Sequence, residues 1–145
     1  LATAIRLHGT LYPLEELELC YAPPFSSAKD PVNMLGFTAA NILKGDMPVY
    51  YAEDIPGLSP EGTTRLDVST PAEFGMSTIP GYQNIPLDEL RGRLSELDPN
   101  KPVYVTCRVG LRGYLATRIL KQHGFDAYNL SGGMKTYQLV RETES

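Results

Sequence analysis

The sequence has few of the residues that usually indicate a disulfide framework or a metal site. Its 145 residues include only two cysteines, two histidines and no tryptophan. Cys20 and Cys107 lie far apart and lack the C-x-x-C spacing of a redox pair. No ligand pattern flanks His8 or His123, so we expect no bound metal. Because disulfides are rare in reducing compartments, the two unpaired cysteines favour a cytoplasmic protein.

Excess positive charge and long hydrophobic runs are also missing. The formal net charge is −4 and the sequence pI is about 5.1, which argues against a nucleic-acid-binding or membrane-surface protein. No apolar run approaches the roughly 20 residues that a membrane-spanning helix needs. What is present, 42% hydrophobic and 21% charged residues, is typical of a soluble globular domain.

Two regions of different composition follow one another along the chain. Residues 1–45 have the pattern of short helices joined by a turn at 21–27 (YAPPFSS), where two prolines prevent a helix. A longer helix is expected to begin at Pro31 and to stop near Gly45. Residues 46–145 form the second region. Because residues 1–7 have helical spacing with no N-cap or methionine before them, we interpret the chain as a piece of a longer protein.

In the second region, segments with strand character alternate with segments of helical character. Strands are expected at 65–69, 103–107 and 127–133, the last running into a Gly-Gly turn, with shorter strands at 49–51 and within 79–86. Helices are expected from a capping box at 70–73, over 87–97, over 111–123 and from residue 134 onward. Strands separated by helices need crossover connections. The pattern therefore predicts an α/β domain with a mostly parallel central sheet and helices on both faces.

The segment 103–114 (VYVTCRVGLRGY) places a cysteine directly after a strand with the composition of a buried parallel strand. Loops in that position line the ligand crevice of a parallel sheet. If the loop curls around the Cys107 sulfur, its N–H groups and the N-terminus of the next helix would stabilise a negatively charged sulfur. Gly110 and Gly113 permit such a tight path. The arrangement predicts a nucleophilic cysteine.

Two arginines in the same loop suggest a second role for it. Arg108 and Arg112 would hold a second anion beside the sulfur through charge-assisted hydrogen bonds. The alternative is that Cys107 is an ordinary buried core cysteine. A core cysteine does not require two arginines and two glycines in the next six positions, so the reactive interpretation is favoured.

Four segments resemble, in order and spacing, the rhodanese-like sulfurtransferase domain: 67–74 (DVSTPAEF), 79–90 (IPGYQNIPLDEL), 103–113 (VYVTCRVGLRG) and 129–137 (NLSGGMKTY). The resemblance covers about residues 46–141, and its most specific part is C-x-x-G-x-R after a strand. It implies a parallel sheet flanked by helices and makes Cys107 the carrier of a persulfide. It also implies an active-site loop that cradles this sulfur, made of Arg108, Val109, Gly110, Leu111, Arg112 and Gly113.

The sequence departs from the family's frequent pattern at three places. It has Asp67-Val68-Ser69 where the family often has D-V-R, and 77–81 (STIPG) where the family often has G-H-I-P-G. Tyr137 stands where a tryptophan is common. These positions mostly support the loop, so the departures bear on donor preference more than on activity. Asp67 is expected to be such a supporting residue, at a strand end and paired with a helix terminus.

Loop length separates this chain from phosphatases of similar fold. Four residues lie between Cys107 and Arg112. The dual-specificity phosphatases that resemble this fold have one residue more, which gives a wider cradle that suits phosphate. The narrower loop favours a sulfane sulfur.

The first region carries a resemblance of its own. Residues 21–37 (YAPPFSSAKDPVNMLGF) are similar to the end of the dimerisation domain in FAD-dependent pyridine nucleotide-disulfide reductases of the coenzyme A-disulfide and persulfide reductase type. Residues 1–45 are therefore expected to be a remnant of that domain, followed by a rhodanese-like domain at 46–145. The resemblance makes Tyr21 a possible coenzyme A-site residue of the parent protein, although packing beside the prolines is the favoured interpretation. Cys20 is expected to pack inside the remnant.

These resemblances define the expected function. Sulfane sulfur would pass from thiosulfate, a polysulfide or coenzyme A persulfide to Cys107, and from there to a thiol or to cyanide. The parent would be a homodimer that uses FAD, NAD(P)H and coenzyme A, but its G-x-G-x-x-G motif is not found here, so we expect no cofactor bound to residues 1–145. The alternative is a catalytically idle rhodanese-like module that serves interaction or dimerisation.

Overall fold

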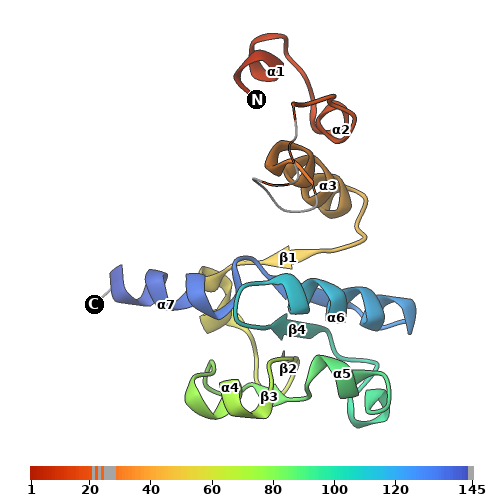
Figure 1. Cartoon of the computed structure of the whole chain (residues 1–145). Coiled ribbons are helices and arrows are strands. Elements are labelled where there is room, and N and C mark those ends of the chain that lie inside the picture. Colours follow the sequence, from red (N-terminus) through yellow and green to blue (C-terminus); the bar gives the residue numbers. More distant parts are fainter. Residues whose placement is uncertain (21, 23, 25–28, 144–145) are drawn as a thin grey trace. The chain divides into compact units, whose positions relative to one another are not determined.

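The chain divides into two compact units, Leu1–Asp46 and Met47–Ser145. We analysed a computed structural model, which describes residues 1–20, 22, 24 and 29–143 (Figure 1). The boundary that composition predicts, between residues 45 and 46, differs from the division between the units by one residue.

The first unit consists of three helices, of which the short α2 packs on the longer α3. The helices are α1 (Ala2–Arg6), α2 (Leu11–Glu15) and α3 (Pro31–Leu43). Asp30 caps α3 by accepting a hydrogen bond from the Val32 amide at 2.8 Å. Helices α2 and α3 approach closely because Gly36 has no side chain: a Cβ there would lie 2.9 Å from Leu14. The Asn33 side chain also donates to the Leu14 carbonyl oxygen, at 3.0 Å.

The second unit is built on a five-stranded sheet. Its strands are β1 (Val49–Tyr50), β2 (Thr64–Asp67), β3 (Gln83–Asn84), β4 (Val103–Thr106) and β5 (Ala127–Leu130). They lie in the order β1-β5-β4-β2-β3, and all neighbouring strands run parallel (Figure 1). The predicted α/β class with a parallel central sheet is thus confirmed.

Helices cover both faces of this sheet, as predicted. The helical elements are η2 (Ala52–Gly57), α4 (Pro71–Met76), α5 (Leu87–Leu90), η3 (Leu94–Glu96), α6 (Leu111–Gln122) and α7 (Gly133–Thr143). Side chains alternate between two hydrophobic cores along each central strand. Val103 and Val105 of β4 pack with α5 and α6 on one face, whereas Tyr104 packs on the other face with η2 and α7.

Two helical elements differ from the expectation. The single helix predicted over 87–97 is broken into α5 and the short 3-10 helix η3, with turn residues that include Gly92 between them. The leucines of this stretch still face the first core. Their spacing therefore predicted correctly that they are buried or partly buried, but it did not predict that the helix is interrupted. The 3-10 helix η2, which contains Pro56, was not predicted because it is too short for a helical period.

Candidate active site

The cysteine loop lies at the carboxyl end of β4, where it turns into α6. Two backbone amides, those of Gly110 and Gly113, donate hydrogen bonds to the Cys107 Sγ atom, each at 3.2 Å. Gly110 has a φ of +97°, a conformation that residues with side chains rarely adopt, and it forms the N-cap of α6. The sulfur therefore lies against the first turn of a helix. Cys107 itself is only 1% exposed.

The start of α7 holds the other side of this loop. The Met134 amide donates to the Cys107 carbonyl oxygen at 2.8 Å, and the Lys135 amide donates to that of Arg108 at 3.1 Å. Gly133 allows this close approach, since a Cβ at that position would collide with the Cys107 carbonyl oxygen. The Asn129 side chain adds a hydrogen bond to the Gly110 carbonyl oxygen at 3.2 Å. The loop is thus held by β5 and by the start of α7, both of which follow α6 in the sequence.

Arg112 has a protein partner instead of a free position beside the sulfur. Its Nη1 and Nη2 atoms donate to the two carboxylate oxygens of Glu73, at 2.6 and 2.8 Å. The hydrogen bonds from Arg112, followed by those from Thr70, lower the pKa of Glu73 to about 2. The same ion pair raises the pKa of Arg112. The expectation that Arg112 holds a second anion is therefore corrected, because its two terminal nitrogens bind α4 to the base of α6.

Asp67 is buried at the end of β2, where its carboxylate accepts two hydrogen bonds. One carboxylate oxygen accepts from the Ser69 amide at 2.9 Å, and the other accepts from the Thr78 hydroxyl at 3.0 Å. Ser69 and Thr78 are two of the positions where the sequence departs from the frequent family pattern. Only the departure at Thr78 supplies a side-chain partner, because the contact from Ser69 is made by its backbone amide. Through Thr78, Asp67 joins β2 to the segment that precedes β3.

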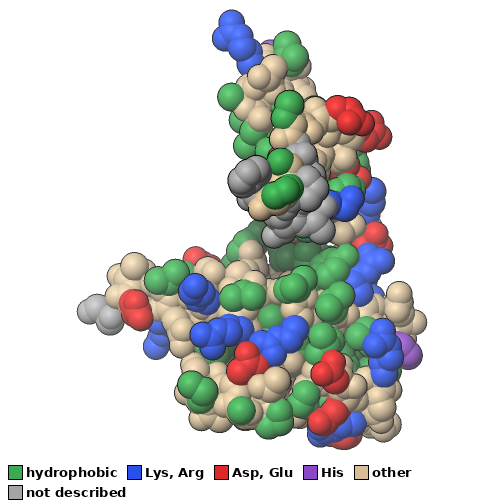
Figure 2. Space-filling view, viewed as in Figure 1, with side chains coloured by type: hydrophobic (Ala, Val, Ile, Leu, Met, Phe, Trp, Pro, Cys, Tyr) green, Lys and Arg blue, Asp and Glu red, His purple; other side chains and the backbone are tan. Residues whose placement is uncertain are grey.

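A cleft of about 310 Å³ opens beside the loop between α4 and α7. Its acidic residues, Asp67 and Glu73, have the partners just described, whereas its basic residues, Arg108 and Lys135, form no ion pair with a described residue. Basic side chains gather around an acidic group in this region of the surface (Figure 2). The cleft consequently offers its unpaired positive charge to an anion.

The structure places the other predicted residues as follows. Val109 and Leu111 are exposed on the outer side of the loop, at 57% and 67%. Tyr137 is partly buried against the second core. Cys20 is exposed, so the predicted packing of its side chain is not seen. Tyr21 lies outside the described residues.

Sequence reasoning missed Glu73 and Lys135 as site residues. Glu73 was seen only as the last residue of the capping box, and its ion pair joins residues 39 positions apart in sequence. Lys135 had a weak signal: it is a basic residue in the first turn of a helix that follows a Gly-Gly turn.

A model of the rhodanese-like domain matches residues 57–139, which include β2, the cysteine loop and most of α7. The chain belongs to the rhodanese-like family. Two curated relatives are the uncharacterized protein YqhL of Bacillus subtilis, 40% identical, and a sulfurtransferase of Allochromatium vinosum, 35% identical. The matches cover 50% and 51% of this chain, and 58% and 70% of the respective relatives.

Two solved structures match both units of the chain. The reduced CoADR-RHD of Bacillus anthracis is 45% identical, with a TM-score of 0.90 over 98% of this chain. An NAD-dependent persulfide reductase from A. fulgidus is 36% identical, with a TM-score of 0.75 over 92% of this chain. This chain spans only 26% and 24% of those two chains, respectively.

Within the described residues, no group of three histidine, cysteine or acidic side chains is arranged to hold a metal ion. No described helix has both the length and the apolar character required to cross a membrane.

Proposed function

We propose that Cys107 carries sulfane sulfur as a persulfide between a small sulfur donor and a nucleophilic acceptor. The observation that carries this proposal is the pair of amide hydrogen bonds from Gly110 and Gly113 to the sulfur. Amide donors at the start of a helix stabilise a negative charge without a metal or a second titratable group.

The chemistry needs two displacement steps and no external oxidant. In the first step, the Cys107 thiolate attacks the outer sulfur of thiosulfate; the bond between the two donor sulfurs breaks, and its electron pair leaves with sulfite. In the second step, cyanide or a thiolate attacks the outer sulfur of the Cys107 persulfide. The sulfur–sulfur bond of the persulfide breaks and its electron pair returns to Cys107. Such a cycle is of the ping-pong type.

Arg108 and Lys135 attract the donor to the mouth of the loop. Both are exposed, and both line the cleft of about 310 Å³ without an ion-pair partner among the described residues. Thiosulfate, polysulfides and low-molecular-weight persulfides are anions at neutral pH and fit this charge. Because Cys107 is 1% exposed, the loop must open slightly for the first step.

In the parent protein this step is coupled to a reductase. The likeness to CoADR-RHD and to the persulfide reductase, across both units of this chain, supports that arrangement. The reductase would use NAD(P)H and FAD to release sulfide or to regenerate coenzyme A thiol, and coenzyme A persulfide is then the natural donor. The parent is a homodimer in this proposal. This chain has no G-x-G-x-x-G segment, so the parent binds both nucleotide cofactors elsewhere.

A sulfurtransferase assay with paired cysteine variants tests the proposal. Thiosulfate-to-cyanide transfer is measured for the unmodified chain, for Cys107→Ser and for Cys20→Ser as the matched control. We expect Cys107→Ser to abolish turnover and Cys20→Ser to retain it. Mass spectrometry should show one added sulfur atom on Cys107 after treatment with donor.

The outcomes separate the proposal from its alternative. Turnover that survives in Cys107→Ser would exclude this sulfur as the carrier. If neither thiosulfate, polysulfide nor coenzyme A persulfide adds sulfur to Cys107, the domain is a catalytically idle module. Labelling by coenzyme A persulfide alone would keep the mechanism and identify the donor.

A further inference from the structure

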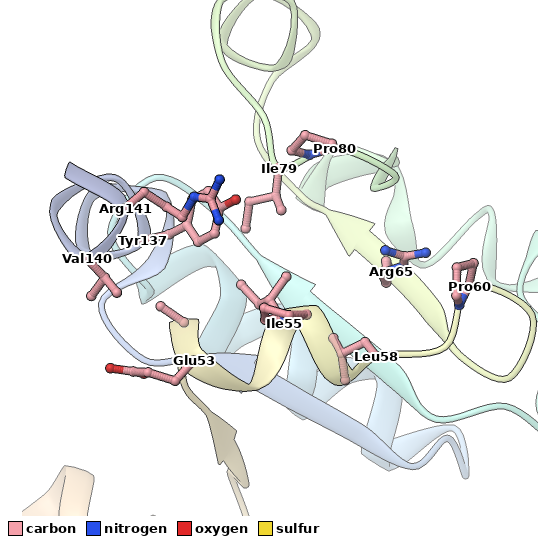
Figure 3. Close-up of a pocket in the computed structure, with 12 residues that line it drawn as sticks. Glu53, Ile55, Leu58, Pro60, Arg65, Ile79, Pro80, Tyr137, Val140 and Arg141 are labelled. Atoms are coloured by element: carbon pink, nitrogen blue, oxygen red, sulfur yellow. The ribbon is translucent and has the colours of Figure 1, made fainter. Parts of the chain in front are cut away.

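A second cavity, separate from the cysteine cleft, lies against the second core. It has a volume of about 470 Å³, within the range of small-molecule sites, and it is bounded by η2, by the start of β2 and by the later turns of α7 (Figure 3). Neither Cys107 nor any other residue of its loop lines this cavity. The mechanism proposed above therefore makes no use of it.

Helix α7 and the segment before β3 form a wall that separates the two cavities. Lys135 and Gln138 of α7 line the cysteine cleft, whereas Tyr137 and Arg141 of the same helix line the second cavity. On the segment before β3, Ser77 lines the cleft and Ile79 and Pro80 line the second cavity. A molecule bound in the second cavity would consequently not occupy the donor position.

Charge in the second cavity comes mainly from two arginines. Arg65 is half-buried and Arg141 is exposed, and neither guanidinium group forms an ion pair or a hydrogen bond with a described residue. The cavity also contains one carboxylate, that of Glu53, at its edge. The chain as a whole has a net charge of −4, so this local positive charge is not a general property of its surface.

Between the arginines, the walls are apolar and stiff. Figure 3 shows Arg141 beside Tyr137 on one side and Arg65 near Pro60 on the other, with Ile55 and Leu58 between the two sides. Ile55 is 8% exposed, so this part of the wall is anchored in the core. Prolines among the lining residues restrict the backbone, which favours a cavity that exists before a ligand arrives.

We propose that this second cavity binds an organic dianion with an apolar middle, one anionic group at each arginine and the apolar part over Ile55 and Leu58. An α,ω-dicarboxylate is the simplest molecule of that class. Its carboxylates accept charge-assisted hydrogen bonds from the guanidinium groups, and its methylene chain covers the apolar wall. This site is independent of the proposed sulfur transfer.

The test uses the full 145-residue chain and matched ligands of different charge. Dicarboxylates from adipate to dodecanedioate are titrated against isotope-labelled protein, and amide chemical shifts locate the site. Monocarboxylates and α,ω-diols of the same chain lengths serve as ligand controls. We expect one of the dicarboxylates to shift the amides of η2, Arg65 and the later turns of α7, and to bind about tenfold more tightly than the matched monocarboxylate.

Protein variants decide whether the two arginines are responsible. Arg65→Gln and Arg141→Gln should each weaken dicarboxylate binding by about tenfold, whereas Arg91→Gln, which lies outside the cavity, should not weaken it. Arg141 is exposed, so its variant should fold even if Arg65→Gln is unstable. Three results would overturn the proposal. They are dicarboxylate binding by Arg141→Gln as tight as by the unmodified chain, diol binding as tight as that of the matched dicarboxylate, and chemical-shift changes confined to the cysteine cleft. If Cys107→Ser loses sulfur transfer but binds the dicarboxylate as the unmodified chain does, the proposed site in the second cavity is supported.

Discussion

At the scale of single residues, the cysteine loop combines contacts between neighbours along the chain with contacts that only the fold brings together. Cys107, Gly110 and Gly113 lie within seven positions, and the structure places the two glycine amides on the sulfur. The sequence predicts such neighbouring contacts, but it does not predict the partners that only the fold brings together. Arg112 was expected to bind an anion because no acidic partner is near it in the sequence. Its partner Glu73 lies 39 positions away, and only the fold brings α4 and α6 together. A motif therefore predicts the local backbone geometry, but it does not predict which residues neutralise its charged side chains.

The charge beside Cys107 leads to a prediction for alkylation. Iodoacetamide should modify exposed Cys20 faster than buried Cys107, because access limits the second reaction. Replacing iodoacetamide by the anionic iodoacetate should favour Cys107, relative to Cys20, by roughly fivefold, which corresponds to about 1 kcal/mol of charge attraction. Lys135→Gln should reduce that preference. Mass spectrometry of the two cysteine peptides over time measures both rates. If the ratio of the iodoacetate rate to the iodoacetamide rate is the same at Cys20 and Cys107, the role of Arg108 and Lys135 is contradicted.

The Arg112–Glu73 ion pair leads to a prediction for acid stability. The pKa of Glu73 is lowered from 4.5 to about 2 in the folded protein, so the unfolded chain binds the proton more readily. The stabilising contribution is therefore complete above about pH 4.5 and is lost as the pH falls towards 2. We expect the unfolding free energy from urea titrations to fall less between these pH values in Glu73→Gln than in the unmodified chain. Glu61→Gln, at an exposed position, is the control and should follow the unmodified chain.

At the scale of elements, end signals predict better than side-chain spacing. The capping box at 70–73 is present as predicted, with the Glu73 amide donating to the Thr70 hydroxyl at 3.3 Å, and α4 begins there. The leucine spacing over 87–97 wrongly predicted one continuous helix, because leucines on a short helix and on a 3-10 helix reach the same core. A cap is a local hydrogen bond, whereas burial is decided by the neighbouring elements.

The junction between the loop and α7 gives a prediction at this scale. Gly133 has a φ of +63°, and a Cβ there would collide with the Cys107 carbonyl oxygen. Gly133→Ala should therefore destabilise the domain by about 2 kcal/mol or more, from the strained backbone together with the collision. Sulfur transfer should fall as well, because the loop loses its hydrogen bonds to α7. Gly57→Ala is the matched control, since its Cβ meets no atom within 4 Å. Urea unfolding and the transfer assay report the two effects, and equal stability of both variants would contradict the packing argument.

At the scale of the whole molecule, alternating strands and helices predict the parallel sheet but not its strand order. Crossover connections follow from sequence order, whereas the position of β1 beside β5 depends on contacts between residues about 80 positions apart, such as Val49 and Asn129. The two-unit organisation was visible in composition because only the second region contains strand segments. Each unit then has the core that its own segments allow. The second has two extended clusters on the faces of its sheet, whereas the buried residues of α1, α2 and α3 are Leu14, Gly36 and Ala40 alone.

This difference in core size predicts how the two units behave when separated. Residues 47–145 contain the entire sheet, both cores and the cysteine loop, so we expect this fragment to fold alone and to retain sulfur transfer. Its midpoint of thermal unfolding should lie within about 5 °C of the full chain, corresponding to a change of roughly 1 kcal/mol. Residues 1–46 bury too few apolar side chains to offset the entropy of folding and should be largely unfolded in isolation. Circular dichroism and amide spectra of both fragments provide the measurement. Collapse of the 47–145 spectrum to that of an unfolded chain would show that the cysteine loop depends on the first unit for its geometry.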